Sequence, residues 1–165
     1  MFELKTLSRD AIPRALEKVE RYRLLNEPAQ AESICHDILH VDPGNQQALI
    51  ALVLSLTDEF DTGPAETMKQ AREAVGRLHS AYDRAYYEGI ICERQARAIL
   101  RQGRPGCGPI AYQWLQQAMR LYEQAEALRA AGNDDALLRW NACVRLITSY
   151  RHLIPTEEPV VALME

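Results

Sequence analysis

Apolar residues recur at three- and four-residue spacing along most of the chain, which is the pattern of amphipathic helices. Ala31, Cys35 and Ile38 follow this spacing, and Ala118 and Tyr122 follow it again farther along. Glycine and proline fall mostly between these periodic segments, and no convincing run of alternating β-branched residues interrupts them. The pattern therefore predicts an all-α fold.

The stretch from Ala31 to Leu56 organises the rest of this fold. It reads as a helix, a tight Asp42-Pro43-Gly44-Asn45 turn, and a second helix that is apolar on most of its faces. A helix of that kind must be covered on both sides, so its neighbours are expected to be helices stacked against it. The sequence thus predicts antiparallel helical hairpins arranged in a short stack.

About seven helices follow from the same periodicity and from the turn residues between segments. Ser8, Asn26 and Asn45 are the expected caps of the first three helices, and Pro64 is expected to begin the fourth. The predicted helices cover residues 8–25, 28–40, 46–58, 64–79, about twenty residues from 81, 109–131 and 134–152. Residues 1–154 are predicted to form one domain, and residues 155–165 a C-terminal tail that starts at a proline.

Composition narrows the classes of function. The 165 residues are 47% apolar and carry a formal charge of -4, so the chain has enough apolar residues for a core and no basic excess for nucleic acid. The N-terminal residues lack the apolar core of a secretory signal, and the longest apolar run, residues 48–54, is too short to span a bilayer. The four cysteines form no CxxC pair, which favours reduced thiols and a cytoplasmic location.

The spacing of small residues resembles the tetratricopeptide repeat. Alanine at Ala31 and a proline at Pro43 stand where that family has the second-helix alanine and the terminal proline of its 34-residue unit. Tyr22 and Gly89 match first-helix positions, whereas the family's tryptophan and leucine are mostly absent. The same second-helix register recurs at Thr67, Ala71, Ala74, Ala118, Tyr122 and Ala125. The resemblance implies a short solenoid of three helix pairs and a closing seventh helix, with a third pair about two turns too long in each helix.

In that family the first helix of each pair lines a concave groove, so the resemblance implies a binding surface for a peptide or a helix of a protein partner. An apolar strip with an aromatic residue and flanking charges suits an amphipathic segment, and it lacks the lysine and asparagine of the family's carboxylate clamp. Equally, Ile50, Leu54 and Ile90 fit core positions beneath the seventh helix. Carried over position by position, the groove residues are Leu16, Glu20, Arg23, Gln47, Ile50, Leu54, Tyr86, Ile90, Glu93, Arg94 and Arg97.

Arginines follow one side of the fifth predicted helix toward its C-terminus, from Arg94 and Arg97 to Arg101 and Arg104. A solvated face that complements the helix dipole explains such a run, and bidentate binding of a carboxylate or phosphate is the alternative. Similarly, Tyr86 is either a binding anchor or part of a helix–helix seam.

The sequence offers little for catalysis or metal binding. His36 and His40 have the i, i+4 spacing of metal ligands, but no third ligand follows at a metal-site spacing. The glycine-rich loop at 103–108 lacks the lysine and the preceding strand of a phosphate-binding loop. We therefore predict no catalytic residue, no cofactor and no metal site. The alternative is an enzyme or metal protein that uses Cys35, His36, His40 or His79.

Taken together, these patterns predict a non-enzymatic adaptor or scaffold that binds a protein segment in its groove, with neither nucleic acid nor membrane as a partner. The second hypothesis is a self-association module, in which the groove or the long third hairpin is buried in a homodimer.

Overall fold

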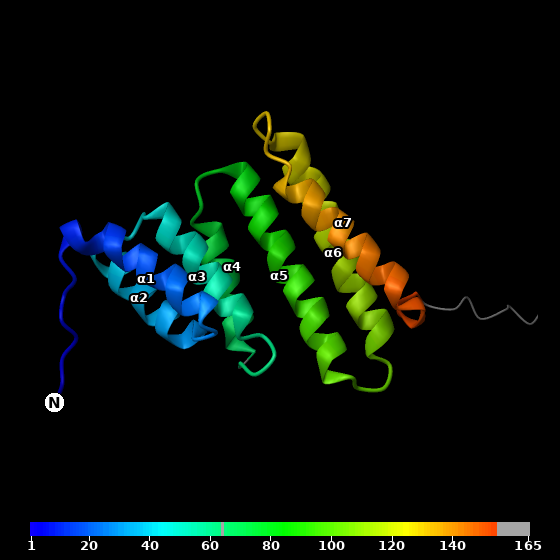
Figure 1. Ribbon diagram of the computed structural model, residues 1–165, viewed down its shortest axis with the longest axis horizontal. Helices are drawn as coiled ribbons and strands as arrows, with labels where there is room; N and C mark the ends of the chain where they lie inside the picture. Colours follow the sequence, from blue (N-terminus) through cyan, green and yellow to red (C-terminus); the bar gives the residue numbers. More distant parts are fainter. Residues whose placement is uncertain (64, 155–165) are drawn as a thin grey trace, which may run out of the picture.

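The computed structural model describes residues 1–63 and 65–154, and these residues form seven α-helices joined by short turns, with no β-strand among them (Figure 1). Short 3-10 turns at Arg9–Ala11 and Arg151–Leu153 flank the helices. The helices are α1 (Ile12–Leu24), α2 (Pro28–Val41), α3 (Gln46–Asp58), α4 (Glu66–Gly76), α5 (Ala81–Gln102), α6 (Cys107–Leu128) and α7 (Asp135–Ser149). The all-α prediction is confirmed.

The predicted helix caps are right at α3 and wrong at α2. The Asn45 side-chain oxygen accepts the backbone N–H of Ala48 at 2.9 Å, as an N-cap should. Asn26, however, has a φ of 59°, which is the left-handed conformation, and it lies in the turn after α1. Glu27 therefore takes the N-cap position of α2, and its side chain makes no capping hydrogen bond. Ser8 precedes the Arg9–Ala11 turn, and its side chain makes no capping bond.

Other boundaries shift by a turn or less. α6 begins at Cys107, two residues before its predicted start at Pro109. The helix accommodates this proline because an N–H in the first helical turn would have no partner within the helix. α6 ends at Leu128, where Arg129 adopts extended backbone, and α4 and α7 also end about three residues before their predicted ends. Pro64, the predicted start of the fourth helix, and the predicted tail at residues 155–165 lie outside the described residues.

The apolar helix α3 is enclosed, as its sequence requires. It packs against α1, α2, α4 and α5, and Ala48, Leu49 and Val53 are fully buried. Full burial of one such aliphatic side chain stabilises a fold by about 1.5–3 kcal/mol relative to its exposure to water. α3 therefore anchors the N-terminal half.

Two apolar cores lie along the molecule, and α5 contributes to both. The first core fills the space among α1 to α4 and takes in Ile91 and Ala98 from α5. The second core lies among α5, α6 and α7, with Leu115, Tyr122 and Cys143 at its centre. Because α5 supplies side chains to each core, it joins the two halves.

The α5–α6 hairpin is the longest unit, with 22 residues in each helix against 11 to 15 in the other five. This agrees with the long third pair expected from the sequence. The two helices approach closely at Gly89, where a Cβ atom would lie only 2.6 Å from the Tyr122 ring. A side chain at position 89 would therefore force the buried Tyr122 ring to shift.

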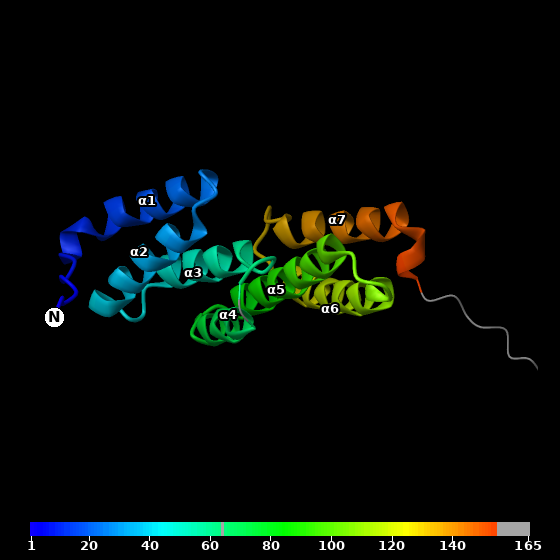
Figure 2. The same cartoon turned by 90° about the horizontal axis from the view of Figure 1, so that it is seen from below.

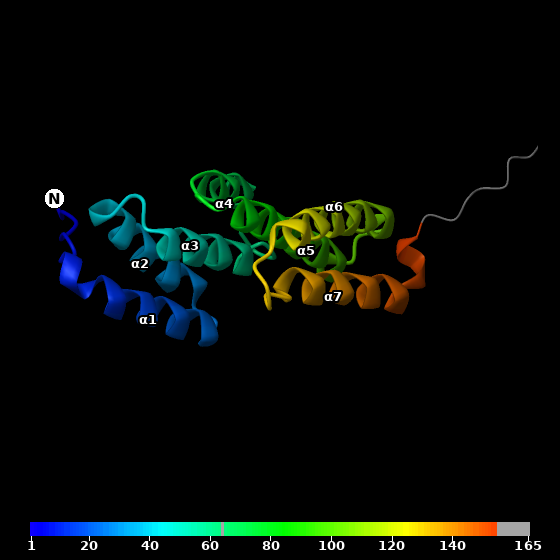
Figure 3. The ribbon, with the colours of Figure 1, turned by 90° about the horizontal axis from the view of Figure 1, so that it is seen from above.

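The helices lie in layers across an elongated molecule. Figures 2 and 3 show α1 and α7 on one side, α4 and α6 on the other, and α3 and α5 between them. The two helices α1 and α7 lie toward opposite ends, so α7 does not cover α1 or α3 (Figure 1).

Candidate binding groove between α1 and α3

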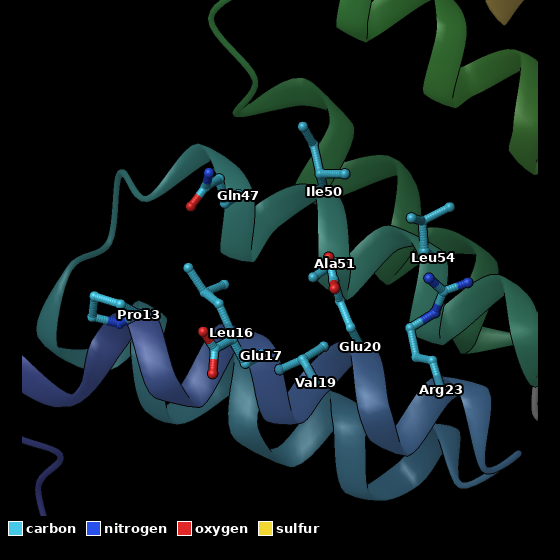
Figure 4. A pocket seen from close by; sticks show the side chains of 10 residues that line it. All are labelled: Pro13, Leu16, Glu17, Val19, Glu20, Arg23, Gln47, Ile50, Ala51 and Leu54. Carbon is cyan, nitrogen blue, oxygen red and sulfur yellow. The ribbon is translucent and has the colours of Figure 1, made fainter.

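An open groove of about 400 Å³ lies between α1 and α3. Its volume is within the range of about 300–1,000 Å³ that is common for ligand sites. Figure 4 shows the side chains of the two helices around this space, and the lining residues are Pro13, Leu16, Glu17, Val19, Glu20, Arg23, Gln47, Ile50, Ala51 and Leu54. Both helices contribute apolar side chains to the lining, α3 adds Gln47, and α1 adds two carboxylates and an arginine.

Six residues that the sequence placed in a groove line this one: Leu16, Glu20, Arg23, Gln47, Ile50 and Leu54. Leu16, Ile50 and Leu54 are only partly buried, so the groove exposes apolar surface that the fold itself does not cover. Four further lining residues were not predicted, although each lies one helical turn from a predicted position: Pro13, Glu17, Val19 and Ala51. Extending each stripe by its 3/4 spacing would have found them.

A polar cavity of about 500 Å³ continues the groove toward α5 and shares Glu20 and Arg23 with it. Here the Asp58 carboxylate accepts hydrogen bonds from Arg23 Nε at 2.8 Å and from Arg94 Nη1 at 3.1 Å. One carboxylate thereby links α1, α3 and α5. Arg94 thus lies in the polar cavity, at the α5 end of the groove.

Tyr86, Ile90 and Arg97 do not line either cavity. Ile90 is 2% exposed within the second core, so its placement in an open groove is wrong and the core alternative holds for it. Tyr86 is half-buried and stacks on Tyr82, with ring centroids 5.7 Å apart, at the seam of α5 with α6 and α7. These α5 positions turn toward the C-terminal half because the long hairpin and α7 cover that face.

Glu93 was also expected in the groove, yet its side chain is only 1% exposed. Its carboxylate accepts hydrogen bonds from Tyr122 Oη at 2.7 Å, Arg97 Nε at 3.0 Å and Arg139 Nη1 at 3.5 Å. A buried carboxylate is stable only when it is paired and hydrogen-bonded in this way. The Glu93 network thus connects α5, α6 and α7. Its sequence signal was a carboxylate on the same inner stripe as Gly89.

The cysteines have the chemistry of core residues rather than of nucleophiles. Burial raises the pKa of the Cys35 and Cys143 thiols to about 12 and that of Cys92 to about 11, so these thiols stay protonated at neutral pH. All four cysteines are free, and Cys107 is half-buried at the start of α6.

Metal-binding geometry is likewise not assembled in the described part of the chain. His36 Nε2 lies 3.3 Å from the Glu32 carboxylate, one turn earlier on α2. Within residues 1–63 and 65–154, no three His, Cys, Asp or Glu side chains come together as a metal site would need.

The described helices include none that is both long enough and apolar enough to cross a bilayer. Comparison of the chain with protein-family models, with curated proteins and with solved structures found no match. The resemblance to the tetratricopeptide repeat therefore rests on the residues quoted above.

Proposed function

We propose that this chain is a non-enzymatic adaptor of the tetratricopeptide-repeat type, which binds a peptide or a helix of a partner protein between α1 and α3. The observation that carries the proposal is the groove itself, with Leu16, Ile50 and Leu54 left partly exposed between two well-packed helices. Apolar side chains of a partner would remove this surface from water, which contributes about 25 cal/mol per Å² of apolar area.

The mechanism is passive docking on a preformed surface. The core beneath the groove is tightly packed, with Val19 and Leu49 both fully buried, so the groove changes little when it is filled. The Asp58 ion pairs hold the α1, α3 and α5 ends in register beside it. We place the adaptor in the cytoplasm, since its thiols are unpaired.

Affinity capture from native cells, followed by mass spectrometry, tests the proposal. The bait is the full chain, and the groove variant is Ile50→Glu with Leu16→Ala, both at partly buried positions in the groove. A partner that the wild-type chain retains should be lost with this variant, while the circular dichroism spectrum stays helical.

The matched control is Leu138→Glu, which introduces the same charge at an exposed leucine of α7. Capture that survives in the control but not in the groove variant supports the proposal. Equal capture by all three proteins would show that partners bind elsewhere. A wild-type mass twice that of the chain, returning to one copy in the groove variant, would favour the self-association hypothesis instead.

A further inference from the structure

The charges along the groove between α1 and α3 are of two kinds. The arginines at its α5 end are already engaged, because Arg23 and Arg94 both bond to Asp58 and Arg101 pairs with Asp61 at 2.7 Å. The carboxylates of Glu17 and Glu20, in contrast, form no ion pair among the described residues, and both are exposed on the α1 wall. The charge that the groove offers to a partner beside its apolar strip is therefore negative.

The opposite end of the groove is balanced in charge. Arg23, Arg94 and Arg101 line the polar cavity together with Asp58, Asp61 and Glu20, so three guanidinium groups meet three carboxylates. The groove thus runs from a negative stretch at Glu17 and Glu20 to a charge-balanced cavity next to α5. Glu17, Glu20 and Arg23 follow one another along α1 (Figure 4).

We infer that the occupant of the groove is an amphipathic helical segment with lysine or arginine beside its apolar stripe, a refinement that rests on the proposed function. Its basic side chains face the exposed carboxylates of Glu17 and Glu20 on the α1 wall.

The length of the groove sets the length of the segment. The lining positions on α1 run from Pro13 to Arg23, and ten residues of helix span about 15 Å. A partner helix of about three turns covers that distance and brings two or three apolar side chains against Leu16, Ile50 and Leu54. The basic residues then flank this stripe at i, i+3 and i, i+4 spacing.

Two synthetic peptides of about 14 residues test the inference directly. They share one apolar stripe of leucine and isoleucine, flanked by lysines in one peptide and by glutamates in the other. Fluorescence anisotropy at low salt should show that the wild-type chain binds the lysine peptide about tenfold more tightly, since two exposed ion pairs supply an effect of that order. The preference should weaken in 0.5 M salt.

Charge reversal in the groove should reverse the preference. The variant Glu17→Lys with Glu20→Lys should bind the glutamate peptide more tightly than the lysine peptide. The matched control, Glu123→Lys with Glu126→Lys, makes the same change of net charge on α6 and should keep the wild-type preference. A reversal in the control as well would mean that net charge, and not the groove, selects the peptide, and would overturn the inference.

The outcomes separate this inference from the proposed function. If both peptides bind equally and Ile50→Glu abolishes both, the groove binds apolar segments but the charge inference is wrong. If neither peptide binds the wild-type chain, the inference is overturned, whereas the capture experiment with native partners still decides the proposed function.

Discussion

The space between alternate helices is open in the N-terminal half of the molecule and closed in the C-terminal half. Between α1 and α3 the space is open and mainly apolar, and partly exposed aliphatic side chains line it. Between α5 and α7 the space is bridged, because Arg139 of α7 reaches Glu93 of α5 and Asn133 meets the Tyr82 hydroxyl at 3.4 Å. The N-terminal half thus keeps a surface available for a partner, and the C-terminal half closes the corresponding surface with its own side chains.

The cores of the two halves also differ in polarity. The α1–α4 core consists almost entirely of aliphatic and small residues, whereas the α5–α7 core has a buried carboxylate bonded to Tyr122 and Arg139 at its centre. Such a polar network tolerates little change at Glu93 and Tyr122, since either group remains buried when it loses its partner. We therefore expect substitutions in the C-terminal network to affect stability, and substitutions in the groove to affect binding.

The largest effect is expected at Glu93. Glu93→Ala leaves the Tyr122 hydroxyl buried without a partner, and the lost side-chain volume leaves a cavity, so we expect a cost of about 3 kcal/mol. Urea unfolding followed by circular dichroism measures the change. The control Glu66→Ala removes an exposed carboxylate on α4 and should stay within about 0.5 kcal/mol of wild type. Similar losses in both variants would contradict a special role for the network.

Gly89→Ala tests the close crossing of α5 and α6. The new Cβ would lie 2.6 Å from the Tyr122 ring, and overpacking of this kind costs about 1–3 kcal/mol. Gly76→Ala is the matched control, because nothing lies within 4 Å of a Cβ at the end of α4 and alanine is the better helix former. Thermal unfolding should show a lower midpoint for the first variant only. A lower midpoint for both would point to the backbone rather than to the crossing.

Alkaline pH tests the burial of the N-terminal core. The Cys35 thiol has a pKa near its ordinary value of 9.0 when unfolded and about 12 in the fold, so only the unfolded chain ionises between these values. The stability that this thiol contributes should be fully present below pH 9 and should fall as the pH rises toward 12, by up to about 1.4 kcal/mol per pH unit. Urea midpoints at pH 8 and pH 10.5 measure the slope. Cys35→Ala should give a flatter slope, and an unchanged slope would contradict the assignment.

The smallest effect on stability is expected at the polar end of the groove. Asp58→Asn weakens the bonds from Arg23 and Arg94, but these side chains are partly exposed, so the expected cost is about 0.5–1 kcal/mol. The loss should shrink further at high salt. A loss comparable to that of Glu93→Ala would mean that the Asp58 ion pairs stabilise the N-terminal half as strongly as the Glu93 network stabilises the C-terminal half, which would contradict the difference between the two halves.

The fold followed from the sequence because local signals agreed with one another. The 3/4 spacing of apolar residues, the Asn45 cap and the Asp42-Pro43-Gly44-Asn45 turn each favour the same hairpin, and α3 could not remain uncovered. Asn26 was misread because asparagine suits both a cap and a left-handed turn position, and only the path of the chain decides between them.

The sequence predicted part of the groove. The predicted positions on α1 and α3, in the N-terminal half, line the groove, whereas several positions on α5 do not. On α1 and α3 the exposed and buried stripes are set by neighbouring short helices, so positions such as Leu16 and Ile50 were placed on the side that lines the groove. On α5 the side taken by Ile90 and Glu93 depends on how α6 and α7 pack, which local periodicity does not reveal. The partnership of Arg94 with Asp58 spans 36 residues and has no local signal either.

The most direct test of the central claim is an NMR titration of the full chain with the lysine-flanked amphipathic peptide. The account predicts that amide shifts concentrate at Leu16, Glu17, Glu20, Ile50 and Leu54, and that α6 and α7 stay unperturbed. Shifts centred on α6 and α7, with α1 and α3 unchanged, would contradict the claim that the open groove of the N-terminal half is the binding surface.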